Sequence, residues 1–205
     1  MQEKKFSQIG PITLPHEWQK GIVKNVTHRL FEFPKERYLV VEIGNVKDNE
    51  NLLVRVQSAC ALADLFESKW CDCALQWKES KRLMFDEPAG LLIHAFDQHG
   101  KGVGLHNHYK LYAEGQKRNQ KILTETFDFL GLNYENRNYE DIAEILKFYN
   151  LSKIRLLTND PERIKFFEKS GFKVERVSLQ PPIDEYNKEE LRIKKERFGH
   201  LLDLS

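Results

Sequence analysis

The order of helix and strand signals between residues 139 and 177 places the tightest limit on the fold. Residues 139–149 predict an amphipathic helix, because their apolar side chains recur at spacings of three and four. Residues 153–158 and 172–177 are short apolar runs typical of strands, with a second helix between them. Helix, strand, helix, strand indicates a partly parallel sheet in this half of the chain.

Local capping signals set the ends of these helices. Asn138 is suited to cap the first helix, and Asp160 precedes a proline, a residue favoured at the first helical position. Gly171 is expected to stop the second helix before the last strand.

The N-terminal half is predicted to be rich in strands. Residues 37–44 and 52–57 indicate two strands in a hairpin-like arrangement, separated by the polar turn 45–51. A helix over 75–85 and a strand over 91–96 follow. The expected fold class is therefore α/β, with mixed β-sheets in the N-terminal half and helices packed on a partly parallel sheet in the C-terminal half.

Length and composition favour one soluble globular domain over residues 1–205. Residues 1–30 are polar and poorly periodic, which suggests an N-terminal extension, and 184–205 suggests a helical tail whose charge-dense segment 184–197 is a solvated face. The 32 basic and 31 acidic residues give no electrostatic reason to expect nucleic acid or an anionic membrane. No apolar run predicts a signal peptide or a membrane span, so the expected location is the cytoplasm.

All three cysteines of the chain fall within fourteen residues, at Cys60, Cys71 and Cys73. An odd number of thiols in a reducing compartment argues against a disulfide framework. Thiolates favour zinc, and three protein ligands leave one tetrahedral position open for water, as in catalytic sites. The alternatives are a structural zinc whose fourth ligand is a histidine, a metal other than zinc, inert buried thiols and a fortuitous cluster. The candidate histidines are His94, His99 and His106.

Five motifs, in this order and nearly this spacing, resemble those of the GTP cyclohydrolase II family. They are residues 54–60 (VRVQSAC), 71–73 (CDC) followed by Gln76, 98–105 (QHGKGVGL), 154–161 (IRLLTNDP) and 199–202 (GHLL). The resemblance implies the first committed step of riboflavin synthesis, in which the imidazole ring of GTP is opened with release of formate and pyrophosphate. It also implies a homodimer.

The resemblance assigns the candidate site residues by position. Cys60, Cys71 and Cys73 would hold one Zn²⁺ per chain, whose bound water attacks C8 of the purine, and Mg²⁺ would accompany the triphosphate. Tyr112 matches an active-site tyrosine, although a tyrosine at helical spacing is more often part of a core. Arg137 matches an arginine proposed to attack the α-phosphorus; because arginine stays protonated, we expect a bidentate phosphate clamp. The residues expected to bind nucleotide are Arg55, Ser58, Gln76, His99, Lys101, Thr158 and Arg163.

Two features favour an anionic ligand without the resemblance. The strand ending at Phe96 runs into the glycine loop 100–104, which allows close backbone approach, although an ordinary flexible turn would look the same. The strand ending at Thr158 meets the N-terminus of the next helix, where Arg163 lies in the first turn. Their other readings are an ordinary cap and a surface charge.

The sequence departs from the family at positions expected to face the nucleotide. Gln57 and Ala59 replace a histidine and a glutamate, and His99 and Lys101 replace a glutamate and an arginine. Glu135 stands where the family has an aspartate, proposed as general base. These departures raise two alternatives: a divergent paralogue acting on another purine nucleotide or performing a partial reaction, and a non-catalytic nucleotide-binding protein.

Overall fold

The computed structural model describes residues 5–120, 123–180 and 182–204 and contains the helix–strand alternation predicted for the C-terminal half. The strands are β1 (Ser7–Gln19), β2 (Ile22–Glu32), β3 (Arg37–Ile43), β4 (Leu53–Ser58), β5 (Gly90–Ala95), β6 (Lys153–Leu157) and β7 (Lys173–Val177). The helices are α1 (Ala61–Asp64), α2 (Cys73–Asp86), α3 (His99–Gly102), α4 (Gly104–Lys117), α5 (Leu123–Phe129), α6 (Glu140–Phe148), α7 (Pro161–Lys169) and α8 (Lys188–Phe198).

The strands form one seven-stranded sheet in the order β1-β2-β3-β5-β4-β6-β7. From β1 to β5 neighbouring strands are antiparallel, and from β5 to β7 they are parallel. The α/β class and the partly parallel sheet are confirmed. The N-terminal strands belong to this same sheet rather than to separate ones.

The predicted hairpin of residues 37–44 and 52–57 is wrong. β5 lies between β3 and β4, pairing antiparallel with β3 and parallel with β4. β4 is buried along most of its length, with helices on both sides of the sheet. A strand buried on both faces is typical of a parallel arrangement, which requires a long crossover; α2 provides this crossover between β4 and β5.

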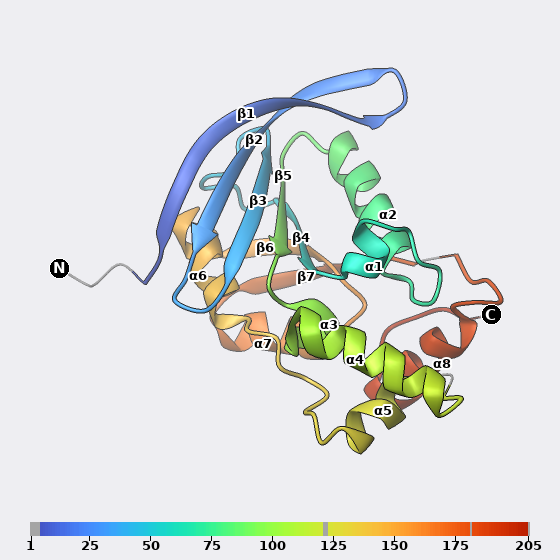
Figure 1. Ribbon diagram of the computed structural model, residues 1–205. Coiled ribbons are helices and arrows are strands. Elements are labelled where there is room, and N and C mark those ends of the chain that lie inside the picture. Colours follow the sequence, from blue (N-terminus) through green and yellow to red (C-terminus); the bar gives the residue numbers. More distant parts are fainter. Residues whose placement is uncertain (1–4, 121–122, 181, 205) are drawn as a thin grey trace.

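The segment 1–30, predicted as a poorly periodic extension, contains most of a long hairpin. β1 and β2 pair antiparallel and curve over the sheet toward the end of α2 (Figure 1). There Trp18 packs against Phe85, and the ammonium of Lys24 lies 4.4 Å from the centre of the same ring. Residues 11–15 of β1 are exposed, and the prolines at positions 11 and 15 disfavour a strand in a sequence-based prediction.

Helices cover the two faces of the sheet (Figure 1). α6 and α7 pack on one face, where Ile142, Ile145 and Phe167 join the main core, and α2 covers the other face through Met84. The predicted cap of α7 is confirmed, because Oδ1 of Asp160 accepts from the N–H of Glu162. The N-cap position of α6 is Tyr139 rather than Asn138, although Oδ1 of Asn138 accepts from the N–H groups of Glu140 and Asp141. No helix of the described residues combines the length and hydropathy that crossing a membrane requires.

Candidate functional site

The parallel strands β4, β5 and β6 end at the same edge of the sheet, and the candidate site lies there. Cys60 follows β4, the glycine loop follows β5, and Thr158 follows β6. Ligands of open α/β sheets bind at the carboxyl ends of parallel strands. The cavity at this edge is closed by α4, α5 and α8, which contribute Tyr112, Phe127 and Lys194 to its wall.

The three cysteines meet in this cavity. The sulfur atoms of Cys60, Cys71 and Cys73 all lie within 4.8 Å of one another. Two thiolates on one zinc ion, at about 2.3 Å each, lie about 3.8 Å apart in a tetrahedron, so small side-chain rotations suffice to bind one ion. In the part of the chain that the structure describes, no histidine or carboxylate joins this group. The cluster therefore fits a metal with one open position.

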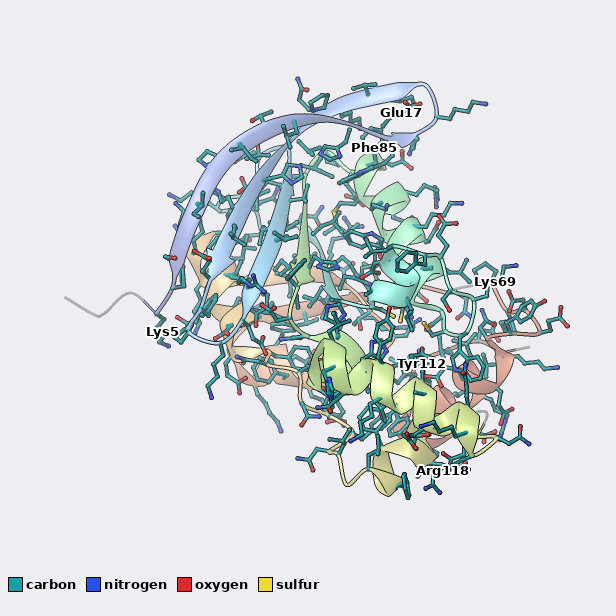
Figure 2. All side chains as sticks on the ribbon, in the orientation of Figure 1. Lys5, Glu17, Lys69, Phe85, Tyr112 and Arg118 are labelled. Atoms are coloured by element: carbon teal, nitrogen blue, oxygen red, sulfur yellow. The ribbon has the colours of Figure 1, made fainter. Side chains whose placement is uncertain are left out.

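The loop that carries Cys60 is held by hydrogen bonding to the side chain of Asp64. Oδ2 of Asp64 accepts from the backbone N–H of Cys60 at 2.8 Å and lies 3.1 Å from Nε2 of His94. His94 is thus a partner of the carboxylate, not the fourth ligand considered from the sequence. Tyr112 projects from α4 toward the sulfur atoms (Figure 2), and burial followed by the nearby thiols raises its pKa. Its phenol is therefore held as a neutral donor.

A chain of buried polar side chains begins beside the thiols. Arg55 donates from Nη2 to Gln57 at 2.6 Å and to Gln76 at 2.7 Å, and from Nη1 to the carbonyl of Leu157. Gln76 in turn donates to Asp72, between two cysteines. Two buried polar atoms of residues that line the cavity, Nε of Arg55 and Oγ of Ser58, have no hydrogen-bond partner among the described residues.

Arg137 reaches the cavity from the loop before α6. Glu135 binds its Nε at 2.7 Å and also its Nη2, which lies 3.1 Å from Asp160. Burial alone would lower the pKa of Arg137, but the hydrogen bond to Glu135 and nearby charges outweigh it and raise the pKa. The guanidinium is therefore a fixed cation with Nη1 left without a hydrogen-bond partner among the described residues.

Lys101 lies over two stacked rings. Its Nζ is 3.8 Å from the ring centre of Tyr134 and 4.9 Å from that of Phe198, and these rings stack 4.2 Å apart. Burial, followed by repulsion from Arg137, lowers the pKa of Lys101 to about 7. Lys101 therefore titrates near neutrality, unlike the arginine that it replaces relative to the family motif.

Thr158, directly after β6, and Arg163, in the first turn of α7, both make contacts within the protein. Oγ1 of Thr158 accepts from the backbone N–H of Asp160. The carboxylate of Asp160 already caps α7, so the N-terminus of this helix is not open to an anion. Arg163 is buried and donates from Nη1 to the carbonyl of Val56 at 2.9 Å. Burial would raise the pKa of Asp160, but Arg163 and Arg137 lower it to about 2.

The structure brings most of the predicted site residues to one cavity. Those in its wall are Cys60, Cys71, Cys73, Tyr112, Arg137, Arg55, Ser58, Gln76, Lys101, Thr158 and Arg163. His99 and Glu135 do not line it within the described chain: His99 accepts a 3.4 Å hydrogen bond from the N–H of Ala61, and Glu135 is exposed and paired with Arg137.

Sequence reasoning missed several wall residues. The segment 184–197 was interpreted as a solvated face, which is wrong for its inner side: Glu190 and Lys194 line the cavity, and Lys194 is buried. His200 also lines it, and burial lowers its pKa to about 4, so it is neutral at pH 7. Asp72 and His200 lie within motifs quoted above, whereas nothing in the sequence marks Lys194.

Glycine is required where the loop after β5 meets the loop carrying Arg137. Gly102 has φ of +85°, and a Cβ there would lie 2.5 Å from the backbone of Asn136. We expect Gly102→Ala to lower the free energy of unfolding by about 2–3 kcal/mol, from backbone strain plus the clash. Gly104, with φ of +83° and no atom within 4 Å of its Cβ position, is the matched control.

In Gly104→Ala only the strain term remains, about 1–2 kcal/mol. Denaturant unfolding of both variants measures the difference, and equal destabilisation would contradict the close approach of the two loops.

Comparison with known proteins now places this fold and site. A family model described as GTP cyclohydrolase II matches residues 20–178. The matched segment includes the strands from β2 to β7 and all three cysteines. The chain belongs to the GTP cyclohydrolase II family.

Similar proteins differ in how much of their own length is matched. GTP cyclohydrolase-2 of Haemophilus influenzae is 32% identical over 97% of this chain and 90% of its own. The riboflavin biosynthesis protein RibBA of Aquifex aeolicus is 31% identical over 98% of this chain and 48% of its own. RibBA of Staphylococcus epidermidis is 34% identical over 83% of this chain and 42% of its own. The chain therefore spans about half the length of its RibBA relatives.

Proposed function

We propose that this protein is a zinc-dependent hydrolase that opens the imidazole ring of GTP and releases formate and pyrophosphate, with Mg²⁺ accompanying the triphosphate. The observation that carries the proposal is the thiol cluster opening onto a cavity lined by fixed cations. When bound, a zinc ion with an open position would supply a Lewis acid that activates water for attack on an electron-poor carbon.

The charge of the cavity wall suits an anionic ligand. Four side chains that stay protonated, together with Lys101, whose pKa is about 7, line it against three carboxylates, which leaves between one and two positive charges before the thiols and their metal are counted. Its histidines, His108 and His200, have pKa values lowered by burial to about 4 and add none at pH 7. The cations are Arg55, Lys101, Arg137, Arg163 and Lys194, and the carboxylates are Asp72, Asp160 and Glu190.

The proposed roles follow from which atoms remain free. Arg137 is clamped by two carboxylates with Nη1 free, so it can donate to a phosphate oxygen without reorganising. Tyr112, a neutral donor near the thiols, would bind an atom of the purine as its ring opens. Glu135 is held in an ion pair that lowers its pKa against the effect of burial, so its role here is to orient Arg137.

The direct test is product release. Purified protein supplied with zinc, magnesium and GTP should release formate and pyrophosphate in equal amounts, measured by a coupled formate assay and by phosphate analysis after pyrophosphatase. Pyrophosphate without formate would indicate a partial reaction, and GTP binding without either product would indicate a non-catalytic protein. Both outcomes would overturn the proposal.

A divergent paralogue is the second candidate, and the contacts of two substituted residues favour it. The side-chain oxygen of Gln57 accepts a hydrogen bond from Arg55. The ammonium of Lys101 lies against an aromatic ring and cannot form the bidentate contact of a guanidinium. Turnover of a panel of purine nucleotides, followed by mass spectrometry, separates the two proposed functions.

The homodimer, expected from the resemblance, and the cytoplasmic location, expected from the sequence, stay predictions. Sedimentation analysis tests the homodimer.

Binding of GTP should take up a proton through Lys101. Its pKa is about 7 in the free protein, where Arg137, Lys194, Glu135 and Asp160 are the charges that act on it. A bound triphosphate adds negative charge and raises this pKa. Affinity should therefore be unaffected by this group below pH 7 and fall by up to about tenfold per pH unit above it.

Calorimetric titration in buffers of different ionisation enthalpy measures the proton uptake. Lys101→Arg is the control, because its guanidinium stays protonated and the uptake should vanish. Uptake that persists in this variant would contradict the assignment to Lys101.

A further inference from the structure

A buried ion pair connects the C-terminal helix to the cysteine cluster. Nζ of Lys194 on α8 lies 2.5 Å from Oδ1 of Asp72, and the side chains are 11% and 1% exposed. The two residues are 122 positions apart in the chain. Desolvation of both ions opposes a pair so deeply buried unless each ion is fully hydrogen-bonded.

Asp72 is held on every side. It lies between Cys71 and Cys73 in the sequence, and its backbone carbonyl accepts from the N–H of Gln76 at 2.8 Å, at the start of α2. Its Oδ2 accepts from the side chain of Gln76, while its Oδ1 accepts from Lys194. The carboxylate thus fixes the short turn on which two of the three thiols stand, and Lys194 fixes the carboxylate.

The position of Lys194 is fixed by hydrogen bonds of the segment that follows α8. After α8 ends, the N–H of Leu201 donates to the carbonyl of Asn159 at 2.8 Å, and Arg176 donates to the carbonyl of Leu201 at 2.8 Å. These bonds tie the C-terminal segment to the residues after β6. Glu190, one turn before Lys194 on α8, lies 3.7 Å from its Nζ.

We propose that Lys194 is a positioning residue of the metal centre, an inference that rests on the metal site of the proposed function. Three thiolates around a divalent cation carry one net negative charge, and Asp72 adds another beside them. Lys194 compensates this charge from α8 and holds the turn of residues 71–73 in the conformation that gathers the sulfur atoms. Partners behind the ligands commonly tune a metal site in this way.

The test compares metal binding by Lys194→Met, Asp72→Asn and the control Lys195→Met, whose residue is the exposed neighbour on the same helix. Zinc affinity is measured by competition with a chromophoric chelator. Cobalt(II) is added to metal-free protein in place of zinc, and its thiolate charge-transfer and d–d bands are recorded. Circular dichroism verifies that each variant is folded.

We expect Lys194→Met and Asp72→Asn to weaken zinc binding by about 10- to 100-fold and to alter the cobalt spectrum. Lys195→Met should leave both unchanged. If Lys194→Met does not fold, the nearly isosteric Asp72→Asn decides the question. Wild-type affinity and spectrum in a folded variant of the pair would overturn the inference, since a pair that only attaches α8 would not alter the metal. Wild-type protein that binds neither ion would instead overturn the proposed metal site.

Discussion

Cys71→Ser is expected to remove the metal and, with it, formate release from GTP. Cys71 is buried, and its sulfur lies within 4.8 Å of the other two. A serine hydroxyl is a poor ligand for zinc, and two thiolates without the third do not enclose the ion. Loss of a Lewis acid is worth several kcal/mol, so turnover should fall by at least about a thousandfold.

The measurement pairs metal analysis with the formate assay on the same preparation. Lys78→Ser, an exposed position on α2, is the control for introducing serine near the cluster and should retain both metal and activity. Cys71→Ser protein that has lost its zinc but still releases formate would show that the thiols serve structure alone.

Arg137→Lys should lower turnover of GTP by about 100- to 1000-fold, the usual loss when one fixed donor to a developing charge is removed. The guanidinium is held by Glu135 and Asp160 along two directions, and a lysine ammonium cannot keep both contacts and still face the cavity. The remaining carboxylates would then repel a phosphate.

Arg155→Lys is the matched control, because Arg155 forms a 2.9 Å ion pair with Glu87 away from the cavity. Steady-state rates of formate and pyrophosphate release, with melting temperatures for both variants, separate lost catalysis from lost stability. An Arg137→Lys enzyme as active as Arg155→Lys would exclude Arg137 from the reaction.

Local signals predicted much of the C-terminal half of the fold. Asp160 and Pro161 mark the start of α7, and Gly171 marks its end before β7. These signals lie within a few residues of the boundaries that they predict. Strand pairing is not local. The insertion of β5 between β3 and β4 depends on contacts between residues 37 or more positions apart, and the hint in the sequence was the nearly continuous apolar character of residues 91–96.

The candidate site was predictable where motifs carry it and not where tertiary packing does. The three cysteines and Arg137 were identified from position, and the structure gathers them in one cavity. Lys194 was not, because a lysine in a charge-dense helix has the same sequence signature whether it faces solvent or a buried carboxylate. Only the docking of α8 against the residues after β6 determines that Lys194 faces the buried carboxylate of Asp72.

X-ray absorption at the zinc edge tests the central claim most directly, because it counts the atoms bound to the metal. Protein loaded with one zinc ion per chain should show three sulfur neighbours at about 2.3 Å and one oxygen from solvent. A fourth neighbour with the outer-shell pattern of an imidazole ring, or protein that retains no zinc, would contradict an open catalytic metal site.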